Sequence, residues 1–137
     1  MFERILVAVD ASEQSQKAVA LTTALAERFG SDVLVLHVRE KMSSRAEAVD
    51  AYEGEGDPEL AERTAQELAE LGLKTRFEEP AARFGRVAQT IVAAAESHGS
   101  GVIVMGSRGL SDIGGLLLGS VTHKVVHLAP CPVLIAR

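Results

Sequence analysis

The chain has 137 residues, a length that fits one domain with a sizeable hydrophobic core. Its net charge of −5 argues against nucleic acid or an anionic membrane as the main partner. No apolar run approaches the roughly 20 residues of a membrane span, and no signal-peptide pattern precedes the first strand. The single cysteine, Cys131, excludes an internal disulfide and predicts that the protein is located in the reducing cytoplasm.

The first predicted strand, residues 5–9, is an apolar run that ends at Asp10. An acidic residue at the carboxyl end of a strand in an α/β protein lies beside the ligand crevice, where its carboxylate can accept hydrogen bonds from a ribose hydroxyl or an adenine amino group. Asp10 also suits the turn before the helix predicted over 13–29, and both roles can hold. That helix ends at Gly30. We predict that its inward face consists of Ala18, Leu21, Leu25 and Phe29.

A second buried strand is predicted over residues 33–38. His37, near its end, has no Cys, Asp or second His at catalytic or metal-ligand spacing, so we expect a structural histidine with a satisfied hydrogen bond. Residues 39–59 carry seven acidic side chains against three basic ones, a local net charge of −4. We predict a solvated loop there, with at most a short helix over 46–52; a partner-binding surface is the alternative.

Regular structure resumes at Asp57-Pro58, because aspartate suits a helix N-cap and proline the first helical position. The expected inward face of this helix is Leu60, Thr64, Leu68 and Leu71. A short strand over 74–78 alternates Thr75 and Phe77 with charged residues, which is typical near a sheet edge. A third helix follows over 86–98. Its expected buried side chains are Val87, Ile91, Ala94 and Ala95.

The stretch from residue 102 to 122 carries the strongest functional signal. A buried strand over 102–105 is followed by a glycine-rich loop and by a helix that opens near Ser120. The glycines are Gly106, Gly109, Gly114, Gly115 and Gly119. Glycine allows positive φ and a close approach of the backbone to a ligand, and a helix N-terminus offers unpaired N–H groups and a partial positive charge. The unit predicts a phosphate cradle; the alternative is that the glycines only turn the chain and Gly119-Ser120 is a plain helix cap.

The last helix carries Val121, Val125 and Leu128 on one face. His123 and His127 are four residues apart, a spacing that can hold a metal, but no carboxylate or cysteine stands beside them. We therefore expect a surface pair and no metal site. Cys131 has no helper base near it in sequence and is expected to be a structural thiol. An apolar strand over 133–136 closes the chain.

The spacing Gly106-x2-Gly109-x9-Gly119-Ser120 resembles the G-x2-G-x9-G-S/T signature of the ATP-binding universal stress proteins. The resemblance covers nearly the whole chain, because residues 5–19 resemble the opening strand and first helix of that family and residues 129–137 resemble its closing strand. The sequence departs from the family at Ser100-Gly101, where relatives commonly carry an Asp before the fourth strand.

Alternation of five predicted strands with four helices favours a parallel α/β sheet with helices on both faces. The resemblance implies a single domain over residues 1–137 with strand order 3-2-1-4-5, and a crevice between strands one and four. It also implies ATP or a related adenine nucleotide with Mg²⁺ as the ligand, and a homodimer formed through the last strand. The residues that it assigns to the nucleotide are Ala8, Val9, Asp10, Val38, Met105, Gly106, Arg108, Gly109, Gly119, Ser120 and Val121.

The function implied by the resemblance is a nucleotide-dependent stress-response or signalling module. An enzyme on the same scaffold, an ATPase or a nucleotidyl-transfer relative, is the alternative. No general base or Walker-type acid is evident in position to activate water, and Arg108 alone does not make a turnover site, so we expect slow hydrolysis at most. A dinucleotide-binding fold is disfavoured because no G-x-G-x-x-G follows the first strand. A phospho-receiver is disfavoured because Phe77-Glu78-Glu79-Pro80 offers no acceptor Asp.

Overall fold

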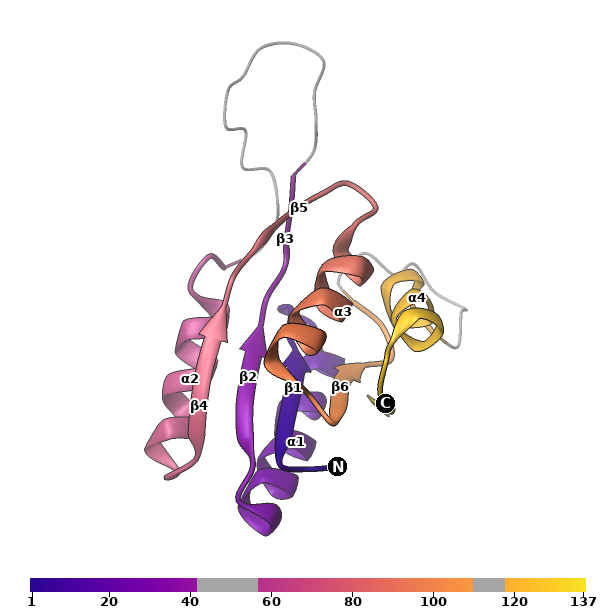
Figure 1. Ribbon diagram of the computed structural model, residues 1–137. Coiled ribbons are helices and arrows are strands. Elements are labelled where there is room, and N and C mark those ends of the chain that lie inside the picture. Colours follow the sequence, from indigo (N-terminus) through magenta and orange to yellow (C-terminus); the bar gives the residue numbers. More distant parts are fainter. Residues whose placement is uncertain (42–56, 110–117) are drawn as a thin grey trace.

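The structure, a computed structural model, describes residues 1–41, 57–109 and 118–137. Its core is a parallel sheet of five strands in the order β4-β2-β1-β6-β7 (Figure 1). Counted among themselves, these strands follow the order 3-2-1-4-5, which confirms the predicted fold class. The strands are β1 (Arg4–Ala8), β2 (Asp32–Leu36), β4 (Lys74–Glu78), β6 (Val102–Gly106) and β7 (Val133–Ala136).

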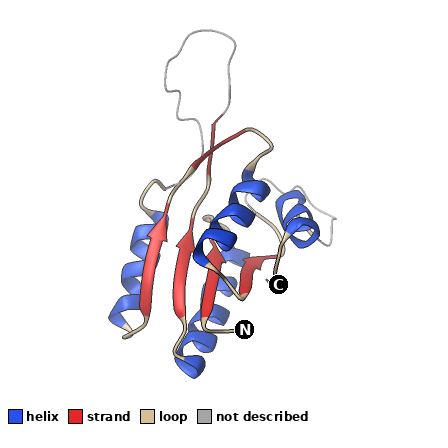
Figure 2. Cartoon of the chain, in the orientation of Figure 1, coloured by secondary structure: helices blue, strands red, loops and turns tan. Residues whose placement is uncertain are grey.

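Two helices cover each face of the sheet (Figures 1 and 2). One layer contains α1 (Glu13–Phe29) and α2 (Leu60–Glu70), and the other contains α3 (Val87–His98) and α4 (Ser120–Leu128). None of the described helices is long and apolar enough to cross a membrane.

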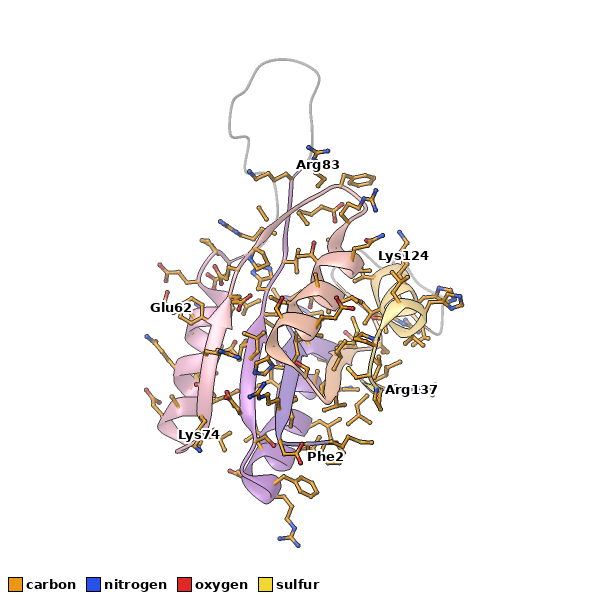
Figure 3. All side chains as sticks on the ribbon, in the orientation of Figure 1. Phe2, Glu62, Lys74, Arg83, Lys124 and Arg137 are labelled. Carbon is orange, nitrogen blue, oxygen red and sulfur yellow. The ribbon has the colours of Figure 1, made fainter. Side chains whose placement is uncertain are left out.

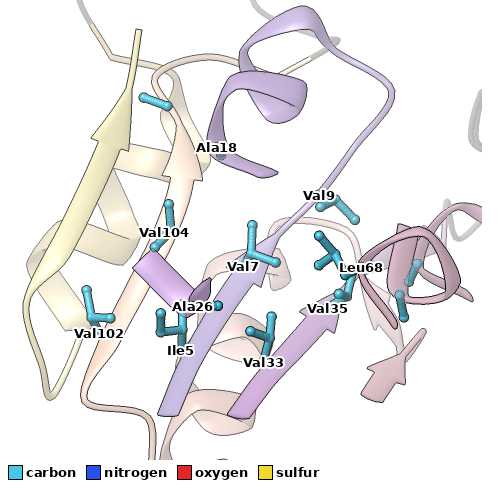
Figure 4. Packing of buried hydrophobic residues seen from close by; sticks show 13 residues of the cluster. Ile5, Val7, Val9, Ala18, Ala26, Val33, Val35, Leu68, Val102 and Val104 are labelled. Atoms are coloured by element: carbon cyan, nitrogen blue, oxygen red, sulfur yellow. The ribbon is translucent and has the colours of Figure 1, made fainter. Parts of the chain in front are cut away.

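The central strands are apolar throughout because both of their faces are buried. Ile5, Val7, Val33 and Val35 project toward α1 and α2, as Figure 4 shows together with Leu68 of α2. The intervening residues Leu6, Leu34, Leu36 and Ile103 face α3 and α4. The alternation of side chains along each strand thus divides one apolar sequence run between two cores.

The inward faces of α1 and α2 differ only in part from the predicted ones, because Ala18, Thr64 and Leu68 are buried as predicted and Leu25 and Leu60 pack on the same core. On α1 the buried residues are Ser15, Ala18, Thr22 and Ala26, whereas Leu21 and Phe29 are exposed. On α2 the buried residues are Ala61, Thr64, Ala65 and Leu68, whereas Leu71 is exposed. The fully buried residues of α1 are thus small, whereas larger side chains such as Leu25, Leu60 and Leu68 also pack on the sheet. Phe29 stacks instead on Phe2, with ring centroids 4.9 Å apart.

A second, two-stranded sheet pairs β3 (Arg39–Lys41) with β5 (Ala81–Arg83). It lies beyond the carboxyl ends of β2 and β4, and Arg83 marks its far end in Figure 3. Residues 39–41 were expected to belong to a loop, and this expectation is wrong, because pairing with β5 supplies the hydrogen bonds that a short charged segment lacks by itself.

The start of α2 also differs from the prediction. The helix begins at Leu60, and Asp57 instead closes the preceding turn by accepting a hydrogen bond from Glu59 N–H at 3.0 Å. The short helix predicted over 46–52 and the glycines Gly114 and Gly115 lie outside the described residues.

Candidate functional site

The chain leaves the sheet in opposite directions at the neighbouring carboxyl ends of β1 and β6. β1 pairs with β6 up to Ala8 and Met105. After β1 the chain continues into α1 on one face, and after β6 it leads to α4 on the other. Such a switch point is where open α/β sheets bind ligands. It brings Asp10 and the loop that begins at Gly106 to one place.

Asp10 has a structural role in the turn before α1. Its Oδ1 accepts a hydrogen bond from Ser12 N–H at 2.8 Å, and its own N–H donates to Ser15 Oγ at 2.9 Å. Ser12 is the N-cap, since its Oγ accepts from Ser15 N–H at 3.1 Å. The other carboxylate oxygen, Oδ2, lies beside Gly109, where an added Cβ would stand only 2.8 Å from it. Asp10 therefore serves the helix start and also faces the glycine loop.

At Gly106 a glycine is required for close packing, and none of the described glycines of the loop has positive φ. Positive φ among the described glycines occurs at Gly30, Gly72, Gly85 and Gly99 only, so that part of the prediction is wrong for Gly106, Gly109 and Gly119. A Cβ at Gly106 would lie 2.8 Å from the carbonyl carbon and Cβ of Gln14 and 3.0 Å from Ser15 N. Gly106 thus lets the end of β6 pack on the first turn of α1.

Hydrogen bonds hold the two described ends of the loop together. Gly119 N–H donates to the Ser107 carbonyl at 2.7 Å, and the buried Thr122 hydroxyl donates to the Gly106 carbonyl at 2.9 Å. Ser107 N–H in turn donates to Ala136 of β7 at 2.8 Å. The N-terminus of α4 is consequently fixed at the carboxyl end of β6.

The first turn of α4 receives no side-chain cap from its N-cap residue. That residue is Gly119, which has no side chain, and Ser120 is the first helical residue and is exposed. Within the Gly119-Ser120 pair that was the alternative helix cap, Gly119 is thus the N-cap, and the Ser120 side chain caps nothing. Because the first N–H groups of a helix have no intrahelical acceptor, this turn can bind an anion. Arg108, half-buried in the same loop, adds a positive charge nearby.

The main chain of Val38 lies between two residues whose N–H groups bond toward β4 and β5. His37 N–H donates to Glu78 and Arg39 N–H to Pro80, both on the side of β4 and β5. If the alternation of an extended chain continues past the end of β2 at Leu36, the N–H and C=O of Val38 are directed to the side of β1. β1 has ended at Ala8, so we expect these groups to face the switch point.

The predicted apolar residues of the site divide between the two faces of the sheet. Ala8, Val38, Met105 and Val121 all belong to the core cluster on the side of α3 and α4, and three of them, all except Met105, are only partly buried there. Val9 belongs to the opposite cluster, so its side chain faces α1 and α2. Only the main chain of Val9 is available on the side of α4.

His37 is buried, as expected of a structural histidine, but one of its two ring nitrogens has no hydrogen-bond partner among the described residues. It is 7% exposed, and its Nδ1 has no hydrogen-bond partner within the described part of the chain. Desolvation lowers the pKa of His37, and the nearby carboxylates of Glu79 and Asp10 oppose that shift. Burial therefore disfavours the charged form of the imidazole beside the switch point.

A pocket that the sequence did not reveal opens between the first turns of α1 and α2. Its volume is about 190 Å³, and it shares Asp10 with the switch point. An ion pair between Asp57 and Arg63 forms part of its wall. Residues from two segments that are distant in the sequence line it, so no local pattern could have predicted it.

Two further expectations concern reactive groups. Burial raises the pKa of the Cys131 thiol, which fits a structural and unreactive cysteine. No group of three or more His, Cys, Asp or Glu side chains that could hold a metal occurs among residues 1–41, 57–109 and 118–137.

Comparisons with known proteins agree with this arrangement. The sequence model of the Universal stress protein family matches residues 1–137. A universal stress protein of Thermus aquaticus is 39% identical over 147 aligned positions, which cover all of both chains. The solved structure of UspA from Lactobacillus plantarum superposes with a TM-score of 0.81 at 25% identity, covering 99% of this chain and 98% of the other. A universal stress protein solved in complex with cAMP superposes with a TM-score of 0.70 at 26% identity, covering 98% and 97%.

Proposed function

The chain belongs to the universal stress protein family, and we propose that it binds an adenine nucleotide, ATP or a close relative, at the switch point between β1 and β6. The observation that carries this proposal is the first turn of α4. Its N-cap, Gly119, offers no side-chain oxygen, and a hydrogen bond to Ser107 fixes it beside the end of β6. The neighbouring α1 is capped by its own Ser12. The first turn of α4 can therefore donate N–H hydrogen bonds to a bound anion, whereas the first turn of α1 is already capped by Ser12.

In this proposal the phosphates lie on the N–H groups and hydroxyl at Ser120, with Arg108 and Gly109 on the other side of the loop. Gly106 supports the site indirectly, by letting β6 approach α1. Asp10 accepts hydrogen bonds from the ribose, and its Oδ2 next to Gly109 supports that role.

The base would lie on the side of α3 and α4. Ala8, Val38, Met105 and Val121 supply an apolar wall there, and the Val38 backbone offers one donor and one acceptor to the adenine edge. Val9 would contribute its main chain only. The cAMP complex of a related protein supports an adenine nucleotide as the class of ligand.

Mg²⁺ would enter with the nucleotide. Because the described residues contain no cluster of three candidate ligands, the ion would be bound mainly by phosphate oxygens and water. We propose a binding module for stress response or signalling in the cytoplasm, with at most slow hydrolysis of ATP. The signal that the module gives would then depend on whether a nucleotide is bound and not on the rate of ATP hydrolysis.

The test combines native mass spectrometry of freshly purified protein with calorimetric titration of ATP, ADP and cAMP. We expect a co-purified adenine nucleotide and a 1:1 titration. Gly109→Val should abolish binding, because its side chain would occupy the space beside Asp10 Oδ2 while the domain still folds. Val126→Ala, on the exposed side of α4, is the control and should bind normally. Unchanged affinity in folded Gly109→Val would disprove the loop assignment.

A further inference from the structure

His123 and His127 lie on consecutive turns of α4, and both side chains are exposed. Their ring centroids are 6.2 Å apart, and the ring planes differ by 12°. Residues four apart are neighbours on a helix surface. The two imidazoles therefore already lie on one side of the helix, which the sequence spacing alone did not establish.

The separation of the rings is compatible with a shared metal ion. A metal–nitrogen bond of about 2.0–2.1 Å, plus about 1.2 Å from a ring nitrogen to the ring centre, places each centroid about 3.2 Å from the ion. Two ligating rings can then be at most about 6.4 Å apart, and about 5.3 Å apart at a tetrahedral angle. The observed 6.2 Å is within this limit, but the rings are stacked with nearly parallel planes, so they must rotate before their in-plane nitrogen lone pairs converge on one ion. Side-chain rotation, which is fast for exposed residues, can close the remaining gap without moving the backbone.

We propose that His123 and His127 form a binding site for a late divalent transition metal, Ni²⁺, Cu²⁺ or Zn²⁺. Neutral imidazole is a ligand that these ions prefer, and a helical pair at this spacing supplies two of the zinc ligands in H-E-x-x-H sites. No third protein ligand is available among the described residues, because no group of three candidate side chains occurs there. Water completes the coordination shell, so the ion exchanges readily.

The metal also acts on the helix that carries it. The two ligands are held close together only while α4 is folded, so an ion that bridges them stabilises the folded state. α4 has nine residues, and Gly119 gives it no side-chain cap, so it has little stabilisation of its own at the N-terminus. The metal site would join its first and second turns.

The test is calorimetric titration of the full-length, nucleotide-free protein with Ni²⁺ in a buffer that does not chelate metals. We expect one ion per chain with micromolar affinity and a rise in melting temperature with added Ni²⁺. His123→Ala and His127→Ala should each weaken binding by about tenfold or more, because each leaves one ligand and removes the gain from chelation.

A matched control separates spacing from histidine content. Lys124 lies on α4 between the two ligands (Figure 3). Lys124→His combined with His127→Ala retains two exposed histidines, but adjacent positions do not face each other on a helix. This variant should bind as weakly as His127→Ala alone, and Cys131→Ser should bind like the wild type. Wild-type affinity in the spacing variant or in either single alanine variant would overturn the proposal, as would a wild type that binds only at millimolar Ni²⁺.

Discussion

The carboxylate of Asp10 is shared between the local fold and the proposed ligand. Oδ1 accepts the Ser12 N–H bond that shapes the turn before α1, whereas Oδ2 lies beside Gly109. The two roles can be separated by substitution, because asparagine keeps one oxygen for the turn and loses the charge. Alanine removes both.

Asp10→Ala should weaken nucleotide binding by about 1.5–3 kcal/mol, the range for a hydrogen bond to a charged group. Adenosine and ATP should lose similar amounts, because the contact is to the nucleoside. Asp10→Asn should retain most of the thermal stability while still losing affinity. Calorimetry and thermal melting of the two variants check this. A loss of stability with no change in affinity would favour the turn as the only role of Asp10.

His37 makes the stability of the fold depend on pH. Burial lowers its pKa below 6.5, and burial likewise lowers the pKa of His98, which is 3% exposed and whose Nε2 has no partner among the described residues. The unfolded chain therefore binds protons more readily than the folded one. Stability is complete above about pH 6.5 and is lost as the pH falls through the folded-state pKa values.

We expect the free energy of unfolding, measured with urea, to fall between pH 7.5 and pH 5. His37→Leu removes one of the two buried titrating groups and should make this fall shallower. A pH dependence that is identical in wild type and variant would show that His37 is protonated in the folded state as easily as in the unfolded state.

At the scale of elements, most boundaries of helices and strands followed closely from sequence, and so did the inward face of α3, whereas those of α1 and α2 followed only in part. The predicted helix over 13–29 coincides with α1, because capping residues and glycine mark its ends locally. Which side packs on the sheet depends on the shape of the opposing strands. On α1 that shape kept the predicted Ala18 and favoured Thr22 and Ala26 over Leu21 and Phe29.

In the candidate site, too, the features that are local in sequence could be predicted and the contacts between distant segments could not. Glycine spacing located the loop and the start of α4, because both are local in sequence. The packing of Gly106 on Gln14 and the unpaired Nδ1 of His37 depend on contacts between distant segments, and no local pattern encodes them.

The contact between β6 and α1 predicts the cost of a side chain at Gly106. Alanine there would press its Cβ on the backbone of Gln14 and Ser15, which cannot swing away. Gly106→Ala should therefore destabilise the domain by about 1–3 kcal/mol, as overpacking of a core does. Gly109→Ala is the matched control, since its nearest atom is the end of a movable carboxylate, and it should cost much less stability. The free energy of unfolding of both variants is measured with denaturant. Equal values would show that the contact of Gly106 with α1 does not exclude a Cβ.

At the scale of the whole molecule, the two edges of the sheet differ in chemistry. β4 is one edge and carries Lys74, Arg76 and Glu78 among its five residues. Charged side chains protect an edge strand from pairing with another chain. β7, the other edge, consists of Val133, Leu134, Ile135 and Ala136 and has no charge of its own. The first three of these are only partly buried, so β7 is the edge that needs a cover.

We expect that cover to be β7 of a second copy, related by a two-fold axis, because such pairing closes the assembly and leaves no further edge of this kind exposed. Light scattering of the wild type should then give about twice the chain mass of 14.5 kDa. Leu134→Lys should reduce the mass to that of one chain or cause aggregation, since it places a charge in the contact. Phe77→Lys, on the opposite edge, should leave the dimer intact, because β4 takes no part in it. A wild type that stays monomeric at tens of micromolar would show that Pro130 and Pro132 and the short length of β7 protect this edge well enough by themselves.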